Sequence, residues 1–205
     1  MGFGNTATRA GVTQVARQLF TDEIHQALVS FCETRVQYLP LQSDNGDFSR
    51  RYGNNIGPFA HLHGQLVEFA SEQFGEEVKP SYSFLSLYDD RGICPLHIDR
   101  DQCRYTIDYL IRQDNEEAWP IYIGQPMSDE RRETLKQSGL SHPSTDEDIA
   151  KTKAKENFET IELRPNDAVL YSGTHQWHYR DRIKAGTADL VFFHFVPEEF
   201  DGPLD

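Results

Sequence analysis

Two hydrophobic periods divide the chain. Up to about residue 79, apolar side chains recur at steps of three and four residues, which is the spacing of one helix face. After Pro80 the period shortens to two, as in strands whose side chains alternate between two faces. The change predicts N-terminal helices and a loop over residues 1–79, followed by a β-rich core over residues 80–197. We expect both to form a single domain of 205 residues.

The helical part contains two apolar patterns with a polar loop between them. The first pattern predicts one or two helices and rests on Val12, Val15, Ala16, Leu19, Phe20, Ile24, Leu28, Phe31 and Val36. Residues 42–57 are rich in Ser, Asn, Asp, Gly and Arg, which predicts a loop. A further helix is expected over residues 59–69, and Gly75 is its expected end.

The second part contains eight short segments rich in β-branched and aromatic residues. They are residues 81–88, 93–98, 103–111, 118–123, 158–163, 168–172, 176–180 and 188–196. A polar stretch at about residues 126–157 interrupts them, and its Ser128 and Ser144-Thr145 are typical helix starts, which predicts a helical insertion. Because no helices alternate with the strands, we expect a mainly β fold: an antiparallel jelly-roll barrel, or double-stranded β-helix, with the N-terminal helices packed on one sheet.

The charge of the chain limits the classes of binding partner that we expect, and its cysteines limit the disulfides that we expect. Lys and Arg number 20 and Asp and Glu 33, so the formal net charge is 20 − 33 = −13, which disfavours nucleic acid and anionic membranes. No apolar run reaches the roughly 18 residues of a membrane span and no secretory signal is present, so a cytoplasmic protein is expected. The three cysteines, Cys32, Cys94 and Cys103, form no CxxC pair and are expected to be reduced, mostly buried thiols. The sequence does not indicate an oligomeric state.

The sequence contains eight histidines, and two segments that carry them have a spacing that suits a metal ion. His97 and Asp99 are two residues apart on a predicted strand, so both side chains point to one face. About eighty residues later, a strand carries His175 and His178, either of which would supply a third ligand. Two histidines and a carboxylate with open positions form the facial triad of non-haem Fe(II) oxygenases.

A competing motif lies in the helical part. His61-Leu62-His63, with Glu68 and Gly75, matches much of the first metal motif of the cupins. Residues two apart on a helix point in nearly opposite directions, so a helix there excludes this site. Of the other histidines, His25 and His142 are expected in solvent and His194 in the core.

The sequence resembles the Fe(II)/2-oxoglutarate-dependent oxygenases of the prolyl-hydroxylase-like branch. The resemblance spans roughly residues 80–197 and rests on Pro95-Leu96-His97-Ile98-Asp99-Arg100, Trp119-Pro120-Ile121-Tyr122, Asn166-Asp167-Ala168-Val169-Leu170-Tyr171-Ser172-Gly173 and Trp177-His178-Tyr179-Arg180. It implies His97, Asp99 and His178 as iron ligands. His178 is favoured over His175 because an aromatic residue and an arginine follow it, as they follow the distal histidine of that family.

One position departs from the family pattern. An Arg or Lys commonly follows the distal histidine by nine to eleven residues and binds the far carboxylate of 2-oxoglutarate, but this chain has Thr187-Ala188-Asp189 there. Arg180 is the first substitute, because it shares a strand face with His178. The alternatives are Arg182, Lys184 and Arg104, and cations at Arg50-Arg51 are further candidate anion contacts. Tyr109 matches a family position where a tyrosine contacts the cosubstrate, although it equally fits a packed sheet position. On another predicted strand, one face carries Tyr82, Phe84, Ser86 and Tyr88, and this face lines either the pocket or the core.

The resemblance implies a hydroxylase that uses Fe(II), 2-oxoglutarate and O2. It would oxidise a C–H bond of a small-molecule or peptide substrate and release succinate and CO2. Two alternatives stay open: a non-catalytic jelly-roll protein, cupin-like, that binds a metal or a small acid, and an isomerase or hydrolase that uses the same triad with another ion. The sequence does not identify the substrate.

Overall fold

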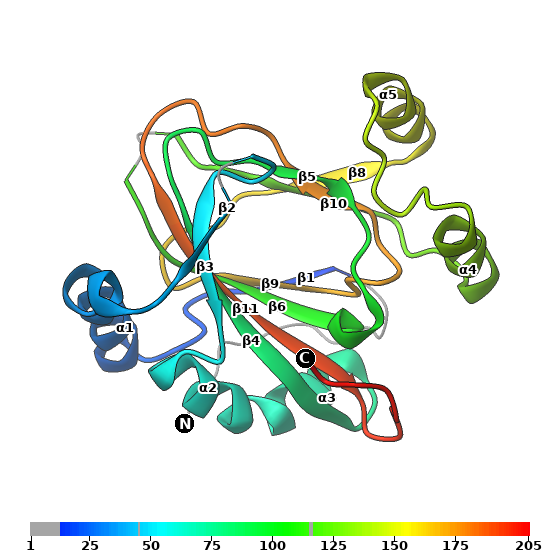
Figure 1. Ribbon diagram of the computed structural model, residues 1–205. Coiled ribbons are helices and arrows are strands. Elements are labelled where there is room, and N and C mark those ends of the chain that lie inside the picture. Colours follow the sequence, from blue (N-terminus) through cyan, green and yellow to red (C-terminus); the bar gives the residue numbers. More distant parts are fainter. Residues whose placement is uncertain (1–12, 45, 115–116) are drawn as a thin grey trace.

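Two antiparallel β-sheets face each other in the computed structural model, which describes residues 13–44, 46–114 and 117–205 (Figure 1). The larger sheet contains, in spatial order, β1 (Gln14–Ala16), β9 (Ala168–Tyr171), β6 (Tyr105–Gln113), β11 (Ala188–Pro197), β4 (Val78–Tyr88), β3 (Arg50–Asn54) and β2 (Gln42–Asp44). The smaller sheet contains β5 (Cys94–His97), β10 (His178–Arg180), β7 (Ile121–Gly124) and β8 (Phe158–Ile161).

Three helices cover the outer face of the larger sheet. They are α1 (Asp22–Thr34), α2 (Gly57–Gln65) and α3 (Val67–Phe74), seen in blue and cyan in Figure 1. The Thr21 hydroxyl accepts a hydrogen bond from the Ile24 amide and so caps α1. Gly75 ends α3 in the left-handed conformation with φ 75°, which a residue without Cβ adopts most easily.

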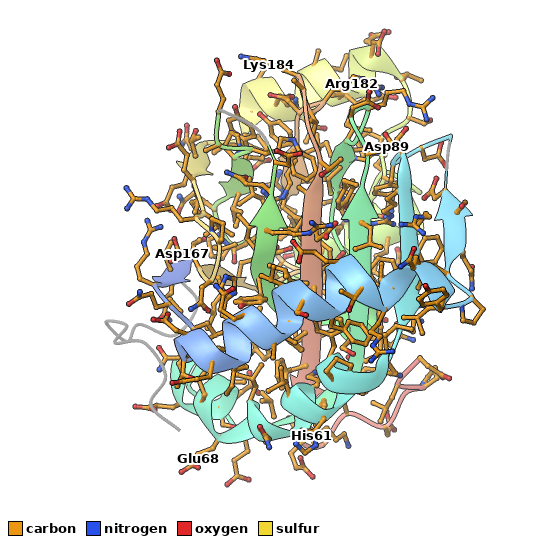
Figure 2. All side chains as sticks on the ribbon, turned by 90° about the vertical axis from the view of Figure 1, so that its left-hand side faces the viewer. His61, Glu68, Asp89, Asp167, Arg182 and Lys184 are labelled. Atoms are coloured by element: carbon orange, nitrogen blue, oxygen red, sulfur yellow. The ribbon has the colours of Figure 1, made fainter. Side chains whose placement is uncertain are left out.

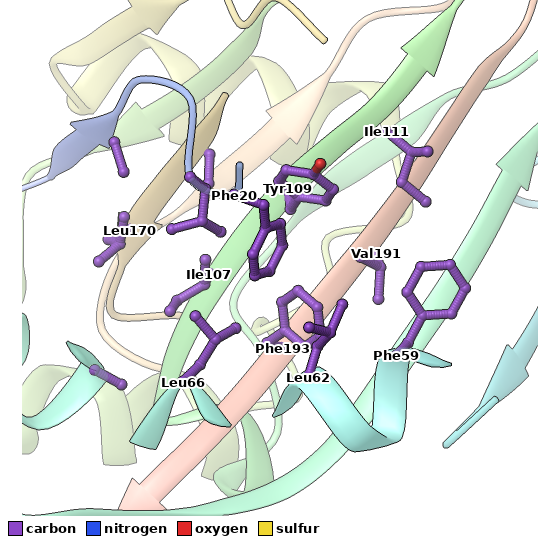
Figure 3. Close-up of a cluster of buried hydrophobic side chains, with 14 of the residues drawn as sticks. Phe20, Phe59, Leu62, Leu66, Ile107, Tyr109, Ile111, Leu170, Val191 and Phe193 are labelled. Atoms are coloured by element: carbon purple, nitrogen blue, oxygen red, sulfur yellow. The ribbon is translucent and has the colours of Figure 1, made fainter. Parts of the chain in front are cut away.

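The main hydrophobic core lies between these helices and the sheet. Figure 3 shows Leu62 and Leu66 from the helices packed against Ile107 and Phe193 from the sheet. The other face of the larger sheet turns toward the smaller sheet, where Leu110, Val169 and Leu190 join Ile121 and Ile123 in a second cluster. Residues on both faces of β6 and β11 are therefore buried, which makes these the central strands of the fold.

The eight predicted strands are all present, but the N-terminal third differs from expectation. The segment around Val15 was expected to be helical, and it forms β1, which pairs with β9 and is one edge of the larger sheet. Residues 42–57, expected to be a loop, contain β2 and β3, which extend the other edge of the sheet beyond β4. Both corrections have one cause: a sheet edge offers unpaired backbone groups to any extended neighbour, and this does not depend on the neighbour's side-chain period.

The polar stretch between β7 and β8 forms the predicted helical insertion. It contains α4 (Asp129–Gln137) and α5 (Asp146–Lys155), whose N-caps are Ser128 and Thr145. Neither helix has a buried residue, so the insertion adds no second core. Among the described residues, no helix is long and apolar enough to cross a membrane.

A buried histidine at the helix–sheet contact makes the fold sensitive to acid. His63 on α2 is 3% exposed, and its Nε2 donates to the His194 carbonyl at 2.9 Å. Burial, helped by the neighbouring His194, lowers the pKa of His63 to about 3. Below pH 6.5 the unfolded chain therefore binds a proton that the folded chain does not, so the free energy of unfolding falls as the pH drops from about 6.5 toward 3.

The variant His63→Gln removes this titrating group and keeps a donor. Between pH 7 and pH 5 we expect the wild type to lose up to about 2 kcal/mol more unfolding free energy than the variant. Urea unfolding at the two pH values measures the difference. Equal losses in the two proteins would contradict the assignment.

Candidate metal centre

Three side chains converge where β5 pairs with β10. His97 is the last residue of β5, Asp99 follows two residues later, and His178 is the first residue of β10, directly opposite His97 in the antiparallel register. The Asp99 Oδ1 lies 3.3 Å from the His97 Nε2 and 3.6 Å from the His178 Nε2. One donor atom from each residue lies within 4.8 Å of the others, so a single ion would reach all three.

Backbone carbonyls fix how the two imidazoles are turned. The His97 Nδ1 donates to the Pro95 carbonyl at 2.7 Å, and the His178 Nδ1 donates to the Gln176 carbonyl at 2.9 Å. With the proton on Nδ1, each neutral ring presents its Nε2 lone pair toward Asp99. Two imidazole nitrogens and one carboxylate on one side of an ion form the facial triad that suits Fe(II), so the residues present fit that metal.

The electrostatics of the trio also favour a cation. Burial alone would raise the pKa of the Asp99 carboxyl, but the His178 and His97 imidazoles beside it hold that pKa well below its usual range. Burial opposes the protonation of His97, and Cys94 and Asp99 nevertheless raise the pKa of His97 well above its ordinary value. A positive charge between these groups is thus favoured, as a proton or as a metal ion.

A glycine makes room for the carboxylate. Gly173 lies in the loop between β9 and β10, and its carbonyl accepts the Asp99 amide hydrogen bond at 2.8 Å. A Cβ at this position would lie 2.2 Å from the Asp99 Oδ2 and 2.5 Å from the Cys103 carbonyl oxygen. Only glycine therefore allows the backbone to approach the ligand so closely.

The trio lines a cavity of about 280 Å³ between the two sheets. One side of the cavity is aromatic and is formed by Tyr82, Phe84 and Tyr88 of β4. The alternation of side chains along β4 puts these three residues on one face, which was expected to line either the pocket or the core. Three guanidinium groups line it as well, those of Arg50, Arg100 and Arg180.

Arg180 is held in a closed, buried ion pair. Its Nη2 donates to the Asp108 Oδ2 at 2.7 Å and its Nη1 donates to the Trp119 carbonyl at 2.7 Å. The side chains of Arg180 and Asp108 are 3% and 0% exposed. The other carboxylate oxygen, Asp108 Oδ1, is buried with no hydrogen-bond partner among the described residues, and burial raises the pKa of this carboxyl despite Arg180.

Arg50 has donor capacity left over. Its Nη1 donates to the Tyr88 hydroxyl at 3.0 Å and to the Ser86 Oγ at 3.2 Å. Its Nε is buried with no hydrogen-bond partner in the described part of the chain, because the Asp44 Oδ2 is 3.9 Å away. The guanidinium lies over the Phe48 ring at 3.9 Å and over the Phe84 ring at 4.9 Å.

Tyr109 does not lie in this cavity. Figure 3 shows it beside Phe20 in the core between the helices and the larger sheet. Its hydroxyl bonds the His25 Nδ1 at 2.7 Å and the Asn166 Oδ1 at 3.1 Å. Of the two positions that the sequence allowed for Tyr109, the structure has the packed one: alternation along β6 turns the neighbouring Asp108 to the cavity and Tyr109 away from it.

The other predicted anchors also lie outside the cavity lining. Arg182 and Lys184 lie at the surface, where Figure 2 labels both, and they contact the Arg91 carbonyl and Glu117. Arg104 contacts the ring of His175, which in turn donates to the Asp129 Oδ1 at 2.7 Å. His175 therefore contacts the insertion and is not part of the trio. Of the predicted site residues, the structure brings together His97, Asp99 and His178, and Arg180 lines the same cavity.

Five further histidines remain. His25 was expected in solvent, but it is buried on α1, where its ring bonds the Tyr109 hydroxyl. The cupin-like pair lies on α2, where His61 bonds Gln65 and His63 bonds the His194 carbonyl, so the pair does not converge. His142 is exposed, as expected, and it also stacks on His97 with ring centroids 5.4 Å apart, because the hydrogen bond from the Ile98 amide to the Ser141 carbonyl holds this part of the insertion over the site. His194 is buried as expected but also lines the cavity. No pattern around His142 in the sequence signals this contact.

Gly173→Ala tests the close approach to Asp99. The added methyl has to displace the carboxylate, so we expect Ni(II) affinity, measured by calorimetric titration, to fall about tenfold or more. Gly64→Ala is the matched control, because a Cβ there meets nothing within 4 Å. Unchanged affinity in Gly173→Ala, or an equal loss in the control, would contradict the proposed geometry.

Comparisons with known proteins place the fold. No family model and no curated protein matches the sequence. Among solved structures, the non-haem alpha-ketoglutarate-dependent carbocyclase SnoK from nogalamycin biosynthesis has a TM-score of 0.71 at 11% identity, over 92% of this chain and 81% of that one. HygX from Streptomyces hygroscopicus, with nickel and 2-oxoglutarate bound, has a TM-score of 0.61 at 16% identity, over 93% and 85%. A Pseudomonas putida prolyl-4-hydroxylase has a TM-score of 0.61 at 11% identity, over 92% and 94%. The chain therefore has the fold of the non-haem Fe(II)/2-oxoglutarate-dependent oxygenases that its motifs resemble.

Proposed function

We propose that this protein is a non-haem oxygenase that uses Fe(II), 2-oxoglutarate and O2 to hydroxylate a C–H bond of a small-molecule or peptide substrate, with release of succinate and CO2. One observation carries the proposal: the His97, Asp99 and His178 donors converge at the wall of a cavity that arginines also line, among them the buried Arg180. We also infer that the two facing sheets form a double-stranded β-helix barrel around this cavity.

The residues of the trio have distinct tasks in this proposal. His97 and His178 would each give an Nε2 lone pair to Fe(II), and Asp99 would give a carboxylate oxygen. When bound, the iron and 2-oxoglutarate supply the activation of O2 and the oxidation of the C–H bond. The protein holds the ligands in place through the Pro95 and Gln176 carbonyls and through Gly173, which reduces the reorganisation needed on binding.

The far carboxylate of 2-oxoglutarate needs several donors in a buried place. We assign this task to Arg180, Tyr88 and Arg50. The Tyr88 hydroxyl accepts from Arg50, so its own proton is free to be donated, and burial keeps it on the oxygen by raising the pKa of Tyr88 to about 12. Asp108 neutralises Arg180, so the additional positive charge would come from Arg50, whose paired carboxylate, Asp44, is 3.9 Å away and whose Nε has no hydrogen-bond partner in the described chain.

The insertion between β7 and β8 would limit the access of water to the iron. Lys136 and Arg132 of α4 pair with Asp101, next to the ligand-bearing segment, and Asp129 pairs with His175. His142 lies over His97. A closed cavity protects a reactive oxidant and strengthens the polar contacts with bound substrate, so we assign these helices the role of a cover.

The ligand assignment is tested by anaerobic titration with Fe(II) and 2-oxoglutarate. The chelate gives a weak visible charge-transfer band, and we expect this band in the wild type. It should disappear in His97→Ala and in His178→Ala, because each removes a ligand. Visible difference spectra measure the band.

His175→Ala and His61→Ala are the controls, since neither residue belongs to the trio. Both should keep the band. A wild type without the band would refute the binding of the cosubstrate to iron, and a band that survives in His178→Ala but not in His175→Ala would transfer the third ligand to His175.

The carboxylate subsite is tested by the same band. Tyr88→Phe and Arg50→Gln each remove a donor to a charged group, so we expect the 2-oxoglutarate dissociation constant to rise about tenfold or more. Arg182→Ala should leave it unchanged, because Arg182 bonds the surface carbonyl of Arg91. Equal effects of Arg182→Ala and Arg50→Gln would show that general charge, not this subsite, binds the dicarboxylate.

A further inference from the structure

Two buried side chains of the cavity have no task in the proposed oxygenase reaction. Cys103 and His194 are 2% and 6% exposed, and both line the cavity. Together with Asp99 they form a second group whose donor atoms, one from each residue, lie within 4.8 Å of one another. This group shares only Asp99 with the His97–Asp99–His178 trio.

The fold holds Cys103 close to Asp99. Cys103 ends the one-turn helix Asp101–Cys103, which begins two residues after Asp99. Gly173 packs against both residues, since a Cβ there would meet the Cys103 carbonyl oxygen as well as the Asp99 carboxylate. The Cys103 Sγ also lies 2.9 Å from the Tyr82 hydroxyl, so the thiol faces the cavity wall formed by β4.

A strand irregularity aims His194 at the same place. The register between β11 and β4 shifts between Phe193 and Phe195, so two residues of β4, Ser81 and Tyr82, lie opposite His194 alone. Such bulges redirect side chains near functional sites. The His194 Nδ1 bonds the Thr106 Oγ1 at 3.1 Å, which leaves Nε2 for another partner.

Asp99 has a second oxygen for this group. Its Oδ1 is the atom near the Nε2 atoms of His97 and His178, at 3.3 and 3.6 Å. Its Oδ2 makes none of these contacts. A carboxylate has enough lone pairs to contact an ion through each oxygen, so one aspartate can serve both groups.

We propose that Asp99, Cys103 and His194 form a second cation site, selective for a borderline-soft divalent ion such as Zn²⁺, and that Asp99 bridges it to the iron trio. Sulfur, imidazole nitrogen and carboxylate oxygen are the donors that Zn²⁺ takes in proteins. On binding, the Cys103 S–H bond is replaced by an S–Zn bond and the proton leaves to solvent, with no change of oxidation state.

The second site has a consequence for the oxygenase, and this consequence rests on the proposed function. An ion at Cys103 occupies cavity space beside the iron and draws negative charge of Asp99 away from it. Zn²⁺ is therefore an inhibitor that acts with the iron still bound, and not only by replacing the iron.

Anaerobic titration with Co²⁺ tests the site without any activity measurement. The His97–Asp99–His178 trio contains no sulfur, so a thiolate-to-cobalt charge-transfer band in the near ultraviolet reports the second site alone. We expect two Co²⁺ ions per wild-type chain and this band. Cys103→Ser should bind one ion and lose the band, and His194→Asn should weaken the binding of the second ion.

Matched variants separate this site from the iron site and from other thiols. His178→Ala should keep the thiolate band, so the second site survives a failure of the oxygenase proposal. Cys32→Ser should also keep it, because Cys32 lies on the buried face of α1, outside the cavity. No band in the wild type with Co²⁺ in excess, a band that persists in Cys103→Ser, or a band lost only in Cys94→Ser would each overturn the proposal.

Discussion

The pairing of β5 with β10 is the constraint on which the site depends. Its register places His97 opposite His178, and the Gly173 backbone positions Asp99 beside both. Each imidazole is turned by a carbonyl from its own segment, so the donor set is fixed by backbone geometry and not by flexible side chains. The larger sheet supports this arrangement, because its central strands are buried on both faces and provide the opposite wall of the cavity.

Charge balance is the second organising feature of the cavity. The protein carries a net charge of −13, and yet three arginines line this one cavity. A buried guanidinium is costly unless it is paired. Arg180 bonds Asp108 at 2.7 Å, whereas the carboxylate paired with Arg50, that of Asp44, is 3.9 Å from a buried Nε that has no hydrogen-bond partner in the described chain. This difference in charge pairing between Arg180 and Arg50 favours an anionic ligand in the space between the two guanidinium groups.

Strand alternation explains both what could and what could not be predicted from the sequence. The spacing groups His97 with Asp99 and His178 with Arg180, because residues two apart share a strand face. The choice of His178 over His175 came from the family resemblance. The same rule groups residues of β6 but does not say which group faces the cavity, so the sequence left open whether Tyr109 lines the pocket or packs in the core, where the structure places it. Arg50 and His142 reach the cavity through β3 pairing and through the Ser141 carbonyl, which are long-range backbone contacts without a local pattern.

The central claim is that the trio holds an iron ion that consumes 2-oxoglutarate in this cavity. Release of labelled CO2 from 2-oxoglutarate labelled at C1, with Fe(II) and O2 present, measures it most directly. We expect release by the wild type that depends on O2 and is accompanied by an equal amount of succinate, and no release by Asp99→Asn. No release by iron-loaded wild type, or equal release by Asp99→Asn, would contradict the account.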